Sequence, residues 1–254
     1  MSVNLENILV YCSSRNNYEM LENEIFKNVD FEGFDFVNVD DNSCEEQVAL
    51  GKKVCDKNKV DFLSNKGRGL SMALQTVVDY ANNSDKDYKF IFWLSHDCYP
   101  ITKNMFSKLS SLIDSKSLDD MNMMFNLDQY NSHIKCDDAF HHFCWGDDLG
   151  LQFLKSGVYN VTLANFYVFH DQHIKIKYNI PANSFRAAKS GDSYYFCDAN
   201  RHYGHWEDKW GFDRSWQTQL DTLPESVIST YKGTLLEEFM NHDYTKGPLK
   251  TFNF

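Results

Sequence analysis

The sequence has few of the features that mark several protein classes. Its seven cysteines contain no CxxC pair, so neither a disulfide framework nor a zinc ribbon is expected. No apolar run approaches the roughly 20 residues that a membrane-spanning helix needs. Residues 1–14 lack the basic start, the long apolar stretch and the cleavage site of a signal peptide. These absences predict a cytoplasmic protein with reduced thiols and no transmembrane segment.

The chain also has fewer basic than acidic residues. The chain has 25 Lys and Arg against 36 Asp and Glu, a formal net charge of −11, so a nucleic-acid partner is not expected. Prolines number only four, and neither repeats nor low-complexity segments divide the 254 residues. A hydrophobic fraction of 43%, with 20 Phe, is enough for a substantial core.

Apolar strand-like runs alternate with helix-like segments along the first half of the chain. Strands are predicted at 7–13, 34–39, 60–63, 88–95 and 122–127, and helices at 18–27, 44–57, 71–82 and 103–114. This order is typical of an open, mostly parallel α/β sheet with helices on both faces. The aromatic-rich remainder is less regular. We therefore predict a core over residues 1–175 and an irregular C-terminal lobe over 176–254 that does not fold independently.

Polar clusters follow four consecutive predicted strands. They read "YCSSRNN", "VNVDDNS", "LSNKGRG" and "SHDCYP". One Asp at such a place can cap a helix or start a turn. Four clusters in succession instead indicate a shared crevice, because ligands of open α/β sheets bind beyond the carboxyl ends of the strands.

The order of the clusters resembles a known family. "VDDNS", "NKGRGLSMALQTVVDYA", an apolar strand ending in Asp, and "WGDDLGLQFLKSG" follow one another as in the nucleotide-sugar-dependent glycosyltransferases of the GT-A fold, above all the inverting group called family 2. The resemblance covers about residues 7–170, and "RHYGHWEDKWG" is similar to an aromatic segment of some members. It implies sugar transfer with inversion from a nucleoside diphosphate sugar, with UDP as the nucleotide, to a glycan or another hydroxyl acceptor.

The resemblance assigns the nucleotide to the strand ends. Asp40 is expected to accept a hydrogen bond from the uracil ring N–H, since a carboxylate can only accept. A cap on the helix that starts near Cys44 is the alternative role for Asp40, although Asp41 fits that cap better. A solvated loop is the alternative for Ser13 and Arg15, a turn into the next helix for the glycines of "NKGRG", and a place facing the sheet for His96. The remaining residues assigned to the nucleotide are Ser13, Arg15, Asp41, Asn65, Gly67, Arg68, Ser95 and His96.

A metal site is expected at the end of strand 88–95. The resemblance aligns Asp97 with a carboxylate that binds Mg²⁺ or Mn²⁺ on the donor phosphates, and such hard ions need only one or two protein carboxylates. His170, which ends a later strand, is the second expected ligand. Ser95 stands where the family usually has another Asp, which leaves a catalytically inactive binding module as an alternative. A sugar-nucleotide nucleotidyltransferase is a further one, although "YCSSRNNYE" lacks the glycine- and lysine-rich loop that those enzymes need.

Two carboxylates open the helix that ends at Gly157. The resemblance makes Asp148 the general base and gives Asp147 a role in orienting the acceptor or holding the loop. Carboxylates at a helix N-terminus are also favoured by the helix dipole, so a capping pair is the alternative.

Overall fold

A five-stranded sheet forms the centre of the molecule, with the strand order β3–β2–β1–β4–β7. Four strands run parallel and β7 is antiparallel to β4. Their bounds are Ile8–Ser14 (β1), Asp35–Asp40 (β2), Asp61–Ser64 (β3), Phe90–Trp93 (β4) and Met124–Asn126 (β7). The predicted mostly parallel α/β sheet is thus confirmed.

This structure is a computed structural model. It describes residues 5–29, 33–96, 98–100, 117–118, 124–140, 144–158, 160–161, 168–170, 177–178, 199–212, 229–234, 237–238 and 241. The helix predicted at 103–114 and the expected metal ligand Asp97 lie outside these residues.

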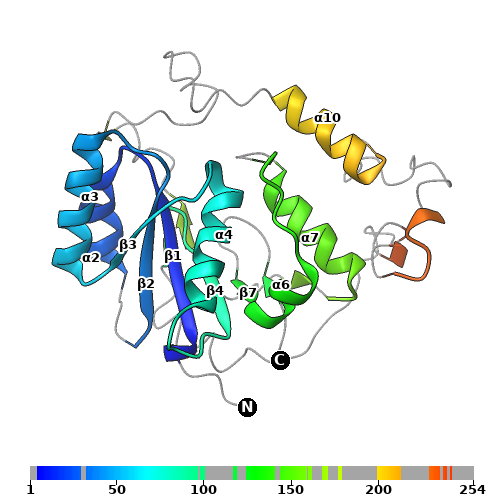
Figure 1. The fold of residues 1–254 in the computed structure, drawn as a ribbon, viewed down its shortest axis with the longest axis horizontal. Helices are drawn as coiled ribbons and strands as arrows, with labels where there is room; N and C mark the ends of the chain where they lie inside the picture. Colours follow the sequence, from blue (N-terminus) through cyan, green and yellow to red (C-terminus); the bar gives the residue numbers. More distant parts are fainter. Residues whose placement is uncertain are drawn as a thin grey trace.

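Helices cover both faces of the sheet, as Figure 1 shows. All seven residues of β1 are buried, because successive side chains point to opposite faces and each face is covered. Ile8 and Val10 belong to the core cluster of the first face, whereas Leu9 and Tyr11 belong to the core cluster of the second face. The helices of the first face are α1 (Tyr18–Met20), a π-helical segment (Leu21–Ile25), α2 (Phe26–Asn28) and α3 (Glu45–Asn58).

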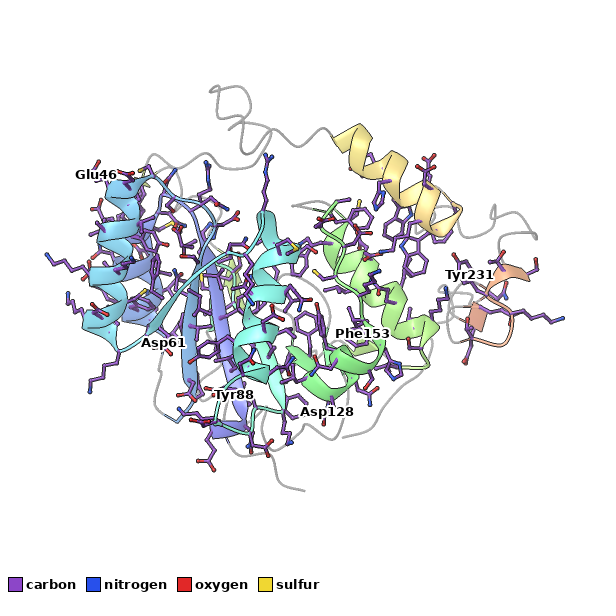
Figure 2. The ribbon with its side chains drawn as sticks, viewed as in Figure 1. Glu46, Asp61, Tyr88, Asp128, Phe153 and Tyr231 are labelled. Atoms are coloured by element: carbon purple, nitrogen blue, oxygen red, sulfur yellow. The ribbon has the colours of Figure 1, made fainter. Side chains whose placement is uncertain are left out.

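The second face is covered by helices whose apolar side chains repeat with helical spacing. α4 (Gly69–Asn82) buries Ala73, Leu74, Val77, Val78 and Ala81 against the sheet. The other two helices on this side are α6 (Leu127–His133) and α7 (Trp145–Lys155). Figure 2 labels Phe153 of α7, whose ring stacks on Phe125 of β7 with the centroids 6.3 Å apart.

One helix that was not predicted lies in the C-terminal part, the 12-residue α10 (Ala199–Trp210). Trp206 and Trp210 of this helix are buried, which repeats an apolar side chain after one turn. The hydroxyl of Tyr231, labelled in Figure 2, donates a 2.6 Å hydrogen bond to the carbonyl of Trp210. The boundary predicted near residue 175 stays a prediction.

Two small sheets complete the described elements. β5 (Cys98–Pro100) pairs antiparallel with β9 (Val168–His170), and β6 (Ser117–Leu118) pairs parallel with β8 (Asn160–Val161). The prediction that a strand ends at His170 is confirmed. Among the helices that the structure describes, none is both long enough and apolar enough to cross a membrane.

Candidate functional site

The loops that follow β1, β2, β3 and β4 meet at one edge of the sheet. Figure 2 labels Glu46 near this edge, where α3 begins, and Asp61 and Tyr88 toward the opposite edge, where β3 and β4 begin. Because the four strands are parallel, all their carboxyl ends lie on the Glu46 side. The polar clusters predicted to share a crevice therefore do share one edge.

Hydrogen bonds join these loops directly. Arg15 Nε donates to the carbonyl of Asn42 over 3.3 Å, and Asn42 Nδ2 donates to the carbonyl of Gly67 over 2.9 Å. His96 Nδ1 lies 3.3 Å from the carbonyl oxygen of Ser13. The four loops thus form one continuous polar rim, made of residues from all four predicted clusters.

Asp40 lies at the end of β2 and is 5% exposed. Its Oδ1 accepts a 2.6 Å hydrogen bond from the hydroxyl of Tyr18, and its Oδ2 accepts one of 3.1 Å from the N–H of Ser43. Burial, followed by the hydrogen bond to Asp40, raises the pKa of Tyr18, so the hydroxyl keeps its proton. Asn38 Nδ2 lies 3.4 Å from the same hydroxyl. Asp40 is therefore held in one orientation by side chains of the first face.

Asp41 is not the N-cap residue of α3, a position that Cys44 occupies. Its Oδ1 instead accepts from Asn65 Nδ2 (2.7 Å) and from the N–H of Gly69 (3.0 Å), the first residue of α4. Gly69 has a φ of +77°, a left-handed conformation that favours glycine, and this brings its N–H to the carboxylate. Asp41 consequently anchors the third loop, whereas Asp40 supports the turn before α3.

The third loop contains Asn65, Gly67 and Arg68. Asn65 accepts from the N–H of Gly67 through its Oδ1 (3.1 Å), and its own N–H donates to the carbonyl of Asp40 (2.9 Å). A Cβ at Gly67 would lie 2.7 Å from Cγ of Met72, so glycine allows a close approach to α4. Arg68 occupies the N-cap position of α4 with an extended backbone.

The expected metal ligands come from segments that pair with each other. In the β5–β9 ladder Cys98 is the partner of His170, and Asp97 precedes Cys98 in the sequence. Within the described part of the chain, no three His, Cys, Asp or Glu side chains are grouped to hold a metal ion. A carboxylate oxygen and an imidazole nitrogen are donors suited to Mn²⁺. The pairing of these segments therefore fits the predicted ligand set, whose two side chains lie outside the described ones.

The amino end of α7 lies beside the same edge of the sheet. The rings of Trp93, the last residue of β4, and Trp145, the first residue of α7, pack edge to face with centroids 5.0 Å apart. In the first turn of α4, Ser71 Oγ donates a 2.8 Å hydrogen bond to the carbonyl of Asp137, in the segment before α7. These two contacts bring the predicted base helix next to the polar rim.

Asp148 is the most enclosed carboxylate of the site, at 2% exposure. Lys209 Nζ lies 2.8 Å from its Oδ1 and 2.9 Å from its Oδ2. Trp210 Nε1 donates to Oδ1 (2.9 Å), and Gln152 Nε2 donates to Oδ2 (2.8 Å). Burial raises the pKa of Asp148 in spite of the hydrogen bond from Lys209, which opposes the rise.

The two acidic residues of α7 occupy different environments. Asp147 is half-buried in the first turn, while the carboxylate of Asp148 binds side chains of α10 and Gln152. The helix begins after Cys144, which has a φ of +62° and makes no side-chain cap. Asp148 therefore links two helices and does not act as the cap that was the alternative interpretation.

Lys209 also reaches a second carboxylate. Its Nζ donates to Asp137 Oδ2 over 2.9 Å, and His205 Nε2 lies 3.0 Å from the same oxygen. Although burial opposes the change, the hydrogen bonds from His205 and Lys209 lower the pKa of Asp137 to about 2. Asp137 is thus ionised at neutral pH and binds Lys209 together with Asp148.

Six residues that shape the site had no predicted role. They are Tyr18, Asn38, Asp137, Gln152, Lys209 and Trp210. Two of them, Lys209 and Trp210, lie in the segment "RHYGHWEDKWG", for which the sequence predicts no role beyond its similarity to an aromatic segment of the family. Nothing in the local pattern around Asp137 or Gln152 indicates their partners.

No protein-family model matches the sequence, and no curated protein matches it. Solved structures do match. The mannosyltransferase PcManGT from Pyrobaculum calidifontis, solved with GDP-Man and Mn²⁺, is 10% identical, with a TM-score of 0.46 over 62% of this chain and 54% of its own. This chain thus spans about half the length of that enzyme.

Two further solved structures are similar to the chain. Residues 1–349 of S. aureus TarS are 11% identical, with a TM-score of 0.49 over 87% of this chain and 82% of theirs. GalNAc-T7, solved with UDP, GalNAc and Mn²⁺, is 12% identical, with a TM-score of 0.48 over 66% of this chain and 43% of its own.

Proposed function

We propose that this chain is an inverting glycosyltransferase that moves a sugar from a UDP-sugar to a hydroxyl group of a glycan or another acceptor. One observation supports this most: α7, the helix that contains the buried Asp148, begins at the edge of the sheet where the polar rim lies, through the Trp93–Trp145 and Ser71–Asp137 contacts. Sugar transfer to a hydroxyl requires a site for the nucleotide-sugar donor and a group that accepts the proton of the hydroxyl.

The rim suits the nucleotide. Asp40 uses two of the roughly four acceptor positions of its carboxylate, which leaves capacity for the N–H of a uracil ring. Arg15 lies in the first loop and Arg68 in the third. A guanidinium group can donate two parallel hydrogen bonds to one phosphate. We assign Ser13, Asp41, Asn65, Gly67, Ser95 and His96 to the same donor site.

We propose that Asp97 and His170 hold Mn²⁺ or Mg²⁺. The support is the pairing of Cys98 with His170, because facing residues of an antiparallel ladder have Cα atoms roughly 4.5–5.5 Å apart. When bound, such an ion neutralises charge on the leaving diphosphate. The protein's own contribution is to bring the two segments together.

We assign Asp148 as the base that takes the acceptor's proton, and Asp147 as the residue that orients the acceptor. A raised pKa makes the Asp148 carboxylate a stronger base than an exposed aspartate. With 2% exposure, Asp148 can accept from a sugar hydroxyl only if that hydroxyl replaces a present donor. Trp210 Nε1, a single neutral donor to Oδ1, is the one we expect to be replaced.

Two measurements test the proposal. UDP release from a panel of UDP-sugars, with and without Mn²⁺, should show slow hydrolysis that depends on the metal. Calorimetry of UDP should show weaker binding by Asp40→Ala, and binding that no longer responds to Mn²⁺ in Asp97→Asn. A protein that binds UDP but releases none from any UDP-sugar is an inactive binding module, and pyrophosphate release from UTP and a sugar phosphate would indicate a nucleotidyltransferase.

We also propose that the protein works in the cytoplasm. The support is the sequence: its seven scattered cysteines contain no CxxC pair, a pattern typical of the reduced thiols that reducing compartments maintain. Labelling the thiols of freshly lysed cells, before and after a reductant, would test this.

A further inference from the structure

Lys209 stands between two carboxylates that belong to different segments. Its Nζ is 2.8 and 2.9 Å from the two oxygens of Asp148 and 2.9 Å from Asp137 Oδ2. The ammonium also lies 5.4 Å from the ring centroid of Phe140 and 6.0 Å from that of Trp210, within cation–π range. Contacts on four residues fix its place, although lysine side chains are usually mobile.

The two carboxylates depend on this ammonium to different degrees. The side chain of Asp137 is 19% exposed and has His205 as a second partner, whereas that of Asp148 is 2% exposed. Gln152 and Trp210, the other described side chains that donate to Asp148, are neutral. A carboxylate removed from water tends to take up a proton unless an opposite charge is close. Lys209 supplies that charge.

Other titratable groups face the pair as well. Tyr130 of α6 and Cys136 both have raised pKa values, chiefly through burial, so both are neutral at pH 7. Asp137 is ionised, and His205 contacts Asp137. At neutral pH the group therefore holds two carboxylates around one ammonium, and loss of the ammonium would leave like charges together in a nearly dry space.

We propose that Lys209 is a positioning residue for Asp148: it binds both carboxylate oxygens at once, is itself held by Asp137, and so keeps Asp148 oriented and ionised. Because Lys209 binds both oxygens, the Asp148 carboxylate stays in place when Trp210 Nε1 leaves Oδ1. That Asp148 acts as a base rests on the proposed function. The link between Lys209 and the ionisation of Asp148 does not.

The test is a titration of the Asp148 carboxyl carbon by ¹³C NMR, with its signal identified by its loss in Asp148→Asn. In Lys209→Met the midpoint should rise by about one to three pH units, the size of shift that a neighbouring charge produces. Lys209→Arg, which keeps the charge, should restore most of the parental midpoint. Lys66→Met is the matched control, because Lys66 pairs with Asp79 on the exposed surface at 2.6 Å. An unchanged midpoint in Lys209→Met would overturn the proposal.

A stability cycle covers the case in which Lys209→Met folds poorly. If Lys209 serves Asp148, Lys209→Met combined with Asp148→Asn should lose less stability than the sum of the two single changes, because no buried charge remains unpaired. Additive losses would contradict the proposal.

Hydrolysis of a UDP-sugar gives an independent readout. Lys209→Met should lower kcat, leave UDP affinity unchanged and move the pH of half-maximal rate upward with the NMR midpoint. A parent protein that hydrolyses no UDP-sugar would refute the proposed function, and the titration would still decide the role of Lys209.

Discussion

The hydroxyl of Tyr18 donates a 2.6 Å hydrogen bond to Oδ1 of Asp40, from the first helix to the end of the second strand. Tyr18 is fully buried, and its ring lies against Phe62 of β3 with centroids 5.9 Å apart. The proposed uracil-binding carboxylate is therefore oriented by the hydrophobic core beneath it. Core packing and donor binding are coupled at this point.

Tyr18→Phe should lower both stability and UDP affinity. It removes one donor from a buried carboxylate, which costs roughly 1–3 kcal/mol when the acceptor is left unsatisfied. Urea unfolding and UDP calorimetry measure the two effects. Tyr80→Phe is the control, because Tyr80 donates to Asp61 in an exposed pair and its loss should change stability little. Equal losses in both variants would mean that burial of the Tyr18–Asp40 pair contributes nothing.

Gly51→Ala and Gly204→Ala should change stability in opposite directions. A Cβ at Gly51 in α3 would lie 2.6 Å from Cζ of Tyr18 and 2.8 Å from Cε2 of Phe62, and overpacking of this kind costs typically about 1–3 kcal/mol. A Cβ at Gly204 in α10 meets nothing within 4 Å, so alanine should stabilise that helix by up to about 1 kcal/mol. Thermal unfolding of both variants checks the pair. A stabilised Gly51→Ala would show that the Tyr18 ring can move.

The polar rim can be predicted from the sequence because each of its loops directly follows a recognisable strand. Each strand is an apolar run, the polar cluster follows at once, and parallel pairing then brings the clusters to one edge. The partners of Asp148 cannot be predicted in this way, since Trp210 lies 62 residues further along the chain. No periodicity links those positions. The helix that contains Trp210 was not predicted, although its buried Trp206 and Trp210 repeat at helical spacing.

Asp41 illustrates the same limit at shorter range. Its place before the helix near Cys44 makes a cap the alternative role, yet its Oδ1 accepts from the N–H of Gly69, while Asp40 accepts from the N–H of Ser43 in the turn before α3. Which of two adjacent carboxylates faces each loop depends on the end of β2, where successive side chains point to opposite faces. A one-residue difference in the strand end therefore exchanges the two roles.

Asp137→Asn should make the protein less sensitive to acid. The pKa of Asp137 is lowered to about 2 in the folded protein, below its value in the unfolded chain. Such a group contributes stability above the unfolded pKa, and that contribution is lost as the pH falls from about 4 toward 2. Asn cannot titrate, so the variant should be less stable at pH 7 and should lose less stability on acidification. Urea unfolding at pH 7, 4 and 3 measures this, and parallel pH profiles for variant and parent would contradict it.

Asp148→Asn separates a base from a purely structural carboxylate. An amide keeps one acceptor oxygen for Lys209 and Trp210, but its NH₂ then faces Gln152 Nε2, which is also a donor. Gln152 cannot simply turn over, because its Oε1 accepts from the N–H of Lys135 (2.9 Å) and its Nε2 donates to the Lys135 carbonyl (3.2 Å). The variant should therefore lose roughly 1–3 kcal/mol of stability and still fold.

The same variant should bind UDP as the parent does and transfer sugar at least about a hundredfold more slowly, because an amide cannot take the acceptor's proton. Gln152→Leu is the control for stability alone: it also removes a contact to Asp148 Oδ2 but leaves the carboxylate in place. Asp147→Asn should lose less activity, since its carboxylate is assigned to orientation only. Transfer rates and UDP affinities of the three variants, measured below their unfolding temperatures, decide the matter. If Asp148→Asn and Gln152→Leu slow transfer equally, Asp148 joins α7 to α10 and the proton must go to another group.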